Sequence, residues 1–365
     1  MADQRKIVIC GAGAIGASVA YFLTRRGETP VIVDRAGPAA AASGRAAGFL
    51  ALDWCANTPL DALARASFAL HREIADELGH ERLGYRPMGA LMTAAADEGD
   101  LEQYRTLPNP EWLDGNVVAH DEIGSPQTTA QIDPRLFTTA LVEESVAAGA
   151  TLVEGTIEGL RFDERGAVSG VEVDGRTLEA DRVVLALGPW TAQAQRWVAL
   201  PQVFGTKSVS LVLAAAAPAQ AVFSEFISRT KQRYTIELYP RSGDAVYVSG
   251  FPEHGALPDD PREIVPSDAG CEELQRIAGV HARALADAPV RARSACFRPL
   301  TVDGVPLIGP VEGADGVLVA TGHASWGILN APATGRMVAE MLLDGGSRSV
   351  DATPFSPARL PAGRI

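Results

Sequence analysis

The stretch "KIVICGAGAIGASVAYFLTRRGETPVIVD", residues 6–34, decides the fold. Residues 7–10 form a short apolar run typical of a buried parallel strand, and Gly11, Gly13 and Gly16 follow it in a tight turn. Apolar residues then recur on one helical face, and a second apolar run ends at Asp34. Strand, glycine turn, helix, strand and acid in this order predict a dinucleotide-binding unit. The pyrophosphate would lie at the helix N-terminus, and the acid would accept the ribose hydroxyls.

The next segment, "RAGPAAAASGRAAGFLA" (residues 35–51), bears on whether the dinucleotide is NAD or FAD. Its composition alone indicates a flexible loop of small residues. Its position directly after Asp34 favours a loop that runs along a bound cofactor, where residues 43–45 would offer backbone N–H groups and a hydroxyl. This arrangement favours FAD over a nicotinamide cofactor.

Composition narrows the class of protein. The 365 residues, 47% of them hydrophobic, are enough for two lobes with large cores. There are 32 basic and 45 acidic residues, a net charge of −13, and no long Lys/Arg cluster, so nucleic acid is not an expected partner. No signal peptide or membrane-spanning run is evident, and a homo-oligomer is compatible with the sequence. The scattered cysteines predict neither a disulfide framework nor a metal site, and they favour a reducing, cytoplasmic setting: Cys10, Cys55, Cys271 and Cys296.

Later segments indicate a second part of the same fold and a separate β-rich lobe. Residues 181–190, "DRVVLALGPW", read as a buried strand that runs into a turn at Gly188. Residues 201–293 are dominated by period-2 alternation, with an amphipathic helix from Asp268 to about Asp287. We expect this region, together with residues 85–130, to form a second lobe whose sheet covers the cofactor.

Two C-terminal blocks carry the most specific pattern: "CFRPLTVDGVPLIGP" (residues 296–310) and "GVLVATGHASWGILNAPATGRMVAEMLLDGG" (residues 316–346). With the N-terminal block, they resemble the family of D-amino-acid oxidase, glycine oxidase and sarcosine oxidase. The resemblance implies an α/β fold in which a glutathione-reductase-like, FAD-binding Rossmann domain is joined to a second, mainly antiparallel β substrate domain. We expect residues 1–84, 131–200 and 294–365 in the first domain, and residues 85–130 and 201–293 in the second.

The resemblance also implies which residues hold the flavin. Gly188 could instead be a simple helix entry, and we expect His323 to lie at the flavin edge or to be structural rather than to act as a base. The final helix, which we expect Asn330 to cap with Pro332 close behind, would point its N-terminus at the flavin. The residues expected at the cofactor are Gly11, Gly13, Ala14, Ile15, Gly16, Asp34, Arg35, Ser43, Gly44, Arg45, Ala47, Gly48, Gly188, Trp190, Cys296, Gly322, His323, Gly327, Ile328 and Leu329.

Arg298 and Cys296 each admit two interpretations. By resemblance, Arg298 is the catalytic arginine that clamps the substrate carboxylate; the alternative is an ion pair with a neighbouring acid such as Asp303. A cysteine at the place of Cys296 carries FAD through a thioether in the monomeric sarcosine oxidases. A small buried cysteine is commoner, so we expect non-covalent FAD, with the thioether as the alternative.

The substrate end departs from the glycine oxidase pattern. We expect Tyr234, Glu237, Tyr239 and Trp326 to contact substrate beside Arg298, although alternation places the two tyrosines on opposite faces of the sheet. Glu237 would disfavour a second acid on the substrate and suit a basic group. Core packing remains the alternative for each tyrosine.

Together these features predict an FAD-dependent oxidase. It would oxidise the C–N bond of a small amino acid or secondary amine to an imine, by hydride transfer to flavin N5. O₂ would reoxidise the flavin and yield H₂O₂. The alternatives are a dehydrogenase that uses a quinone or protein acceptor, and a flavin-binding protein without turnover.

Overall fold

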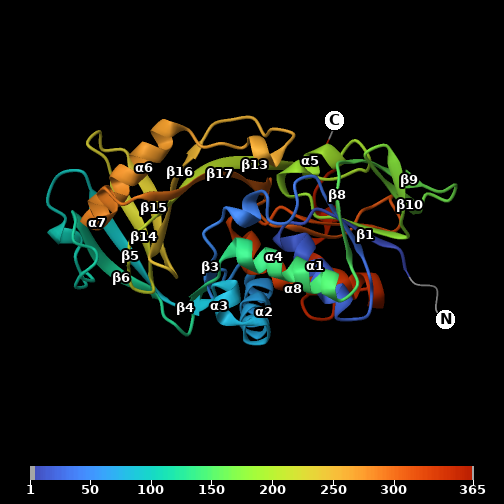
Figure 1. Cartoon of the computed structure of the whole chain (residues 1–365), viewed down its shortest axis with the longest axis horizontal. Coiled ribbons are helices and arrows are strands. Elements are labelled where there is room, and N and C mark those ends of the chain that lie inside the picture. The colour runs from blue at the N-terminus through green and yellow to red at the C-terminus, as the bar shows by residue number, and fades with distance from the viewer. Residues whose placement is uncertain (1–4, 364–365) are drawn as a thin grey trace.

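A computed structural model of the protein describes residues 5–363. Its central sheet, on the right of Figure 1, has the strand order β18-β19-β12-β1-β2-β8. Five neighbouring strands are parallel, and β18 pairs antiparallel at one edge. The strands span Ile7–Cys10 (β1), Val31–Asp34 (β2), Thr151–Glu154 (β8), Arg182–Leu185 (β12), Leu307–Pro310 (β18) and Val317–Thr321 (β19).

Helices cover one face of this sheet and a small β-sheet covers the other. The helical face shares one apolar core with the strands, because each helix presents a buried apolar stripe. The helices are α1 (Ala14–Thr24), α2 (Asp61–Leu78), α4 (Pro134–Ala147) and α8 (Gly327–Asp344), with α3 (His80–Leu83) beside them. The opposite face packs against α5 (Thr191–Ala194) and against β9 (Ile157–Phe162), β10 (Val168–Val173) and β11 (Arg176–Glu179).

The second sheet, on the left of Figure 1, is mainly antiparallel. Its order is β17-β13-β16-β15-β14-β5-β6, and only β14 and β5 pair in parallel. One face packs on α6 (Asp268–His281) and α7 (Arg283–Ala286). The strands span Gly89–Ala96 (β5), Val117–Gly124 (β6), Val203–Leu213 (β13), Gln220–Ile227 (β14), Arg233–Arg241 (β15), Ala245–Glu253 (β16) and Val290–Thr301 (β17).

A further small sheet joins β3 (Phe49–Ala51), β7 (Thr129–Gln131) and β4 (Arg86–Pro87). The α/β fold with a parallel Rossmann sheet and a mainly antiparallel second sheet is therefore confirmed. We propose the domain boundaries that were expected from the sequence, although one strand crosses them. Strand β17 runs across the expected boundary at residue 294, so Arg298, which pairs with Thr206 of β13, still lies on the second sheet.

The start of α8 differs from expectation. The helix begins at Gly327, three residues before the expected cap Asn330, and Pro332 lies inside it. Pro332 has no N–H for the Ile328 carbonyl, and His71 Nε2 of α2 lies 2.9 Å from that oxygen and 3.2 Å from the Leu329 oxygen. Ser67 Oγ, also on α2, accepts a bond from Ala333 N at 3.0 Å. Two side chains of α2, which is far from α8 in sequence but packs against it, therefore replace the interrupted backbone bonds. For this reason the helix can begin earlier than its local sequence indicates.

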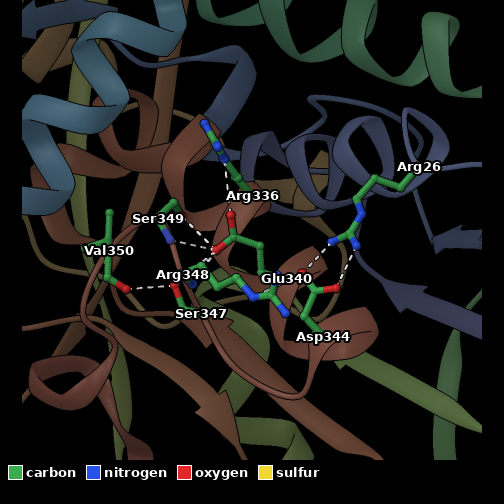
Figure 2. Close-up of polar contacts among 8 residues, drawn as sticks. All are labelled: Arg26, Arg336, Glu340, Asp344, Ser347, Arg348, Ser349 and Val350. Carbon is green, nitrogen blue, oxygen red and sulfur yellow. Dashed lines mark hydrogen bonds and ion pairs between the residues drawn. The ribbon is translucent and has the colours of Figure 1, made fainter.

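Near the other end of α8, the Glu340 side chain holds the turn that follows the helix. Figure 2 shows Glu340 beside Ser347, Arg348 and Ser349 of that turn. Its Oε2 accepts bonds from Arg348 N (2.7 Å), Ser349 N (2.9 Å) and Ser349 Oγ (2.9 Å). Arg336 contacts Oε1 at 3.2 Å. One buried carboxylate thus satisfies the N–H groups of the turn after the helix.

Within residues 5–363, no helix is long and apolar enough to cross a membrane, and no group of His, Cys, Asp and Glu side chains is arranged to hold a metal ion. All four cysteines are free and buried.

Candidate active site

A cavity of about 510 Å³ lies between the carboxyl ends of the parallel strands and the open face of the seven-stranded sheet. Gly11, Asp34, Ala186 and Thr321, which line it, lie at or just beyond the ends of β1, β2, β12 and β19. Ligands of open α/β sheets bind at this edge. The cavity continues from there to Arg298 and Glu237 of the second sheet.

The glycine turn at one end of the cavity is shaped for close backbone approach. Gly11 has φ +112°, and a Cβ at this position would lie 2.4 Å from the Ala186 carbonyl oxygen. A Cβ on Gly16 would lie 1.9 Å from the Gly11 oxygen, so Gly16 serves helix–strand packing and does not line the cavity. Gly13 and the first residues of α1 do line it, and they present the positive end of the helix dipole.

Asp34 is fixed at the same end. Its two carboxylate oxygens accept bonds from Ala12 N at 2.8 Å and Ala36 N at 2.9 Å. Burial raises the pKa of Asp34, and these N–H groups oppose that shift. The carboxylate remains at the cavity wall, where it can accept hydroxyl groups.

The loop after Asp34 is anchored by side chains that the sequence assigned to the cofactor. Ser43 Oγ accepts a bond from Ala14 N at 2.8 Å and lines the cavity. Arg45 points away from it and donates to the carbonyls of Ala295 (2.8 Å) and Ile264 (3.1 Å). Arg45 therefore ties the loop to β17 and to the segment before α6.

The middle of the cavity is formed by the turns that follow β12 and β19. Gly188 has φ +54° and lines the cavity next to Trp190. His323 is buried, and its Nε2 lies 3.0 Å from Thr334 Oγ1. Burial lowers the pKa of His323 to about 3, so the ring is neutral near pH 7. Gly327 brings the N-terminus of α8 to the same wall.

Arg298 lies at the far end, on β17. Its Nη2 is 3.3 Å from Ser208 Oγ and its Nη1 is 3.5 Å from Ser325 Oγ. Within residues 5–363 it forms no ion pair. The acid proposed as its alternative partner, Asp303, is instead bound by Arg359 at 2.8 Å, so that alternative is not what the structure contains.

Glu237 faces the cavity from β15, directly across from Phe223 of β14 and Ser249 of β16. Ser249 Oγ donates to its Oε2 at 3.0 Å. Burial raises the pKa of Tyr239 well above its usual value; the charge of Glu237 raises it further, and the charge of Arg298 opposes this. The charges of Glu237 and Arg298 therefore both influence the pKa of the buried Tyr239 hydroxyl, in opposite directions.

Most of the expected site residues line this one cavity. Besides those named above, they include Ile15, Arg35, Ala47, Gly48, Cys296, Ile328, Tyr239 and Trp326. Five expected cofactor residues lie outside the lining: Gly16, Gly44, Arg45, Gly322 and Leu329. Tyr234 packs with Phe226 and Phe251 in the core beneath α6, on the opposite face from Tyr239 as alternation predicts. We therefore do not carry Tyr234 into the proposed site.

Sequence reasoning missed several wall residues. Phe49 lies near the end of the small-residue segment and Trp54 just after it, while Phe223 and Ser249 are the cross-strand neighbours of Glu237. Once Glu237 is placed at the cavity, period-2 alternation gives the facing residues of the adjacent strands, but only if the strand register is known.

The residues present fit FAD. The glycine cradle, the α1 N-terminus and Asp34 suit the pyrophosphate and ribose, and the cavity continues past Gly48, Gly188 and the α8 N-terminus. Cys296 lines the same cavity, and burial raises the pKa of its thiol, with the Arg298 and Arg45 charges opposing this.

Comparison with known proteins agrees with this geometry. A family described as "FAD dependent oxidoreductase" (DAO) matches residues 6–341. The protein C1F5.03c of Schizosaccharomyces pombe is 29% identical over 385 residues, which cover 98% of this chain and 99% of its own. A glycine oxidase of Geobacillus kaustophilus is 27% identical over 98% of both chains. The crystal structure of the Geobacillus kaustophilus glycine oxidase superposes with a TM-score of 0.79, at 26% identity and over 98% of this chain and 99% of that one.

Proposed function

The chain belongs to this family of FAD-dependent oxidoreductases, and from that premise we propose that it oxidises the C–N bond of a small amino acid or secondary amine to an imine. FAD, when bound, supplies the acceptor for the hydride and its two electrons, and we propose O₂ as the final oxidant, reduced to H₂O₂. Water hydrolyses the imine to a carbonyl compound and an amine or ammonia.

The observation that carries this proposal is the state of Arg298. A guanidinium at a cavity wall, held by two serine hydroxyls and without an ion pair in the described residues, is arranged to receive an anion. Its planar fork matches a carboxylate, and two parallel bonds would fix the orientation of the substrate as well as its position. Arg298 is therefore the proposed catalytic residue.

The proposed reaction does not require the protein to supply a general base. A neutral amine drives hydride loss from its α-carbon with its own lone pair, so no dedicated base is required. This agrees with a neutral, buried His323. The α8 N-terminus, held by His71 and Ser67, presents N–H groups at the wall where negative charge would develop on the cofactor. The apolar walls exclude water from the reacting bond.

We propose that FAD is held without a covalent bond. A thioether at Cys296 requires an activated sulfur, and burial raises the pKa of this thiol, which disfavours the thiolate.

The test is an anaerobic titration of the FAD-loaded protein with glycine, sarcosine, D- and L-amino acids and diamines, followed by the absorbance of oxidised flavin. Bleaching by an amine that carries a carboxylate is expected, and Arg298→Ala should abolish it. Arg293→Ala, an exposed arginine on the same strand, is the matched control and should bleach normally. Absence of bleaching by every amine would contradict the proposal. Bleaching without oxygen consumption in air would replace O₂ by a quinone or protein acceptor.

A further inference from the structure

Glu237 is a charged residue of the cavity that the proposed reaction does not use. Along β15, Ile236 and Leu238 pack into the core beneath α6, so Glu237 and Tyr239 point to the opposite, cavity-facing side. The hydroxyls of Ser249 and Tyr239 are its hydrogen-bond donors, and within residues 5–363 Glu237 forms no ion pair. A half-buried carboxylate whose donors are two neutral hydroxyls keeps its negative charge unpaired, and it is well placed to receive a cation.

The surroundings of Glu237 are aromatic. Phe223 lies 5.0 Å from Phe49, 4.8 Å from Trp54 and 5.5 Å from Tyr239, measured between ring centroids. Trp54 lies 6.3 Å from Trp326 in an edge-to-face arrangement. These five rings, which all line the cavity, form what we call the aromatic wall. Ring faces attract ammonium and guanidinium groups, and they pack against the methylene chains that carry them.

Two physical arguments separate the cation that meets Glu237 from the reacting amine. A carboxylate paired with an ammonium raises the pKa of that ammonium, and so depletes the neutral amine that loses hydride. The separation of Arg298 and Glu237 also argues that the cation at Glu237 is not the reacting amine. Strands β17 and β15 are separated by β13 and β16, three steps or roughly 14 Å between the strands that carry Arg298 and Glu237. An α-ammonium lies directly beside its own carboxylate, whereas a side-chain cation lies several bonds away.

We infer, building on the proposed function, that the substrate is a basic amino acid whose carboxylate meets Arg298 and whose side-chain ammonium or guanidinium meets Glu237. The aromatic wall contacts the methylene chain between them. Glu237 is thus a specificity-determining residue, and the α-amine between the two anchors stays free of a carboxylate partner.

The first experiment compares turnover of lysine, ornithine and arginine, in both enantiomers, with that of norleucine, which lacks the distal charge. In the FAD-loaded wild type, kcat/KM for the best basic substrate should exceed that for norleucine by about 10- to 100-fold, the range for a hydrogen bond to a charged group. Glu237→Gln should remove this preference by lowering kcat/KM for the basic substrates to the level for norleucine, because the amide oxygen still accepts a bond from Ser249 but carries no charge to pair with the distal cation. Glu225→Gln, a carboxylate paired with exposed Arg233 on the same sheet, is the control and should keep the preference.

A second readout is independent of turnover. Binding of 5-aminopentanoate, which has a carboxylate and a distal ammonium but no α-amine, is compared with that of pentanoate through perturbation of the flavin absorbance. The amino compound should bind about 10-fold more tightly or better in wild type, and the two should bind equally to Glu237→Gln.

The outcomes separate the two proposals. Equal turnover and binding of charged and neutral compounds would overturn the role of Glu237 while amino-acid oxidation stands. Failure of every amino acid to reduce the flavin would overturn amino-acid oxidation, and the basic-substrate inference with it.

Discussion

Acid should destabilise this protein well above the pH range in which carboxylates protonate, because three histidines are buried as neutral rings. Burial lowers the pKa of His71 and His281 to about 4 and that of His323 to about 3. In an unfolded chain each ring would titrate near its ordinary value of about 6.5. Between about pH 6.5 and pH 4 the unfolded state therefore binds up to three more protons than the folded state, and stability falls as the pH falls.

The magnitude follows from these shifts. Each histidine contributes a slope of about 1.4 kcal/mol per pH unit, so three give about 4 kcal/mol per unit. At about pH 5 each has cost about 2 kcal/mol relative to pH 8, or about 6 kcal/mol together, which is comparable with the whole stability of many domains. Carboxylates with a lowered pKa affect stability at lower pH than the histidines do. Asp303, with a pKa of about 2, loses its stabilising charge only below about pH 4.

The assay is urea unfolding of the FAD-saturated protein, followed by far-UV circular dichroism, at several pH values from about 8 to about 5. His281→Gln is the informative variant, because His281 lies on α6, away from the cavity. It should reduce the slope by about a third. His254→Gln, an exposed histidine of the preceding segment, should leave the slope unchanged. A wild-type free energy of unfolding that stays flat over this range, or an unaltered slope in His281→Gln, would refute the reasoning.

Three further predictions rest on single contacts. Glu340→Ala should lower the free energy of unfolding by about 1–3 kcal/mol in urea titrations, because partly buried N–H groups lose their acceptor; Glu143→Ala, at an exposed ion pair, should cost less than about 1 kcal/mol. Gly11→Ala should abolish FAD retention on gel filtration, because its Cβ would lie 2.4 Å from a backbone oxygen; Gly37→Ala, also at positive φ but in open space, should retain FAD, and loss of FAD from both variants would mean that backbone strain alone explains the effect. Acid precipitation of the wild type should leave all flavin in the supernatant, and flavin in the pellet that disappears in Cys296→Ser would establish the thioether instead.

The parts of the site that could be predicted from sequence are those in which a local pattern is sufficient. The glycine turn and Asp34 are adjacent along the chain, and their strand–helix–strand context is short, so spacing alone places them. Alternation likewise separates Tyr234 from Tyr239, because both lie on β15.

Features that depend on distant segments were not predictable in this way. The Asn330 cap follows a sound local rule, yet α8 starts at Gly327 because His71 and Ser67, more than 250 residues away, supply the missing bonds. Asp303 is close to Arg298 in sequence, but Arg359 binds it. The aromatic wall is assembled from separate segments. The register of β14 and β15 brings Phe223 and Tyr239 together, whereas Phe49, Trp54 and Trp326 come from β3, the loop after it and the turn before α8.

Arg298 and Glu237 have opposite charges on one sheet, and they do not neutralise each other. The strands between them explain this: Ser208 of β13 contacts Arg298, and Ser249 of β16 donates to Glu237. A neutral hydroxyl satisfies part of each group's hydrogen-bonding capacity, and the intervening strands hold the charges apart, so each keeps capacity for a ligand. A charged pair that met directly would be stable without a substrate and would recognise nothing. Replacing Ser249 by alanine should therefore free Glu237 to turn toward a cation of the protein or toward water, which would weaken binding of 5-aminopentanoate while that of pentanoate is retained. Equal weakening of both compounds would show that Ser249 serves the cavity as a whole rather than Glu237.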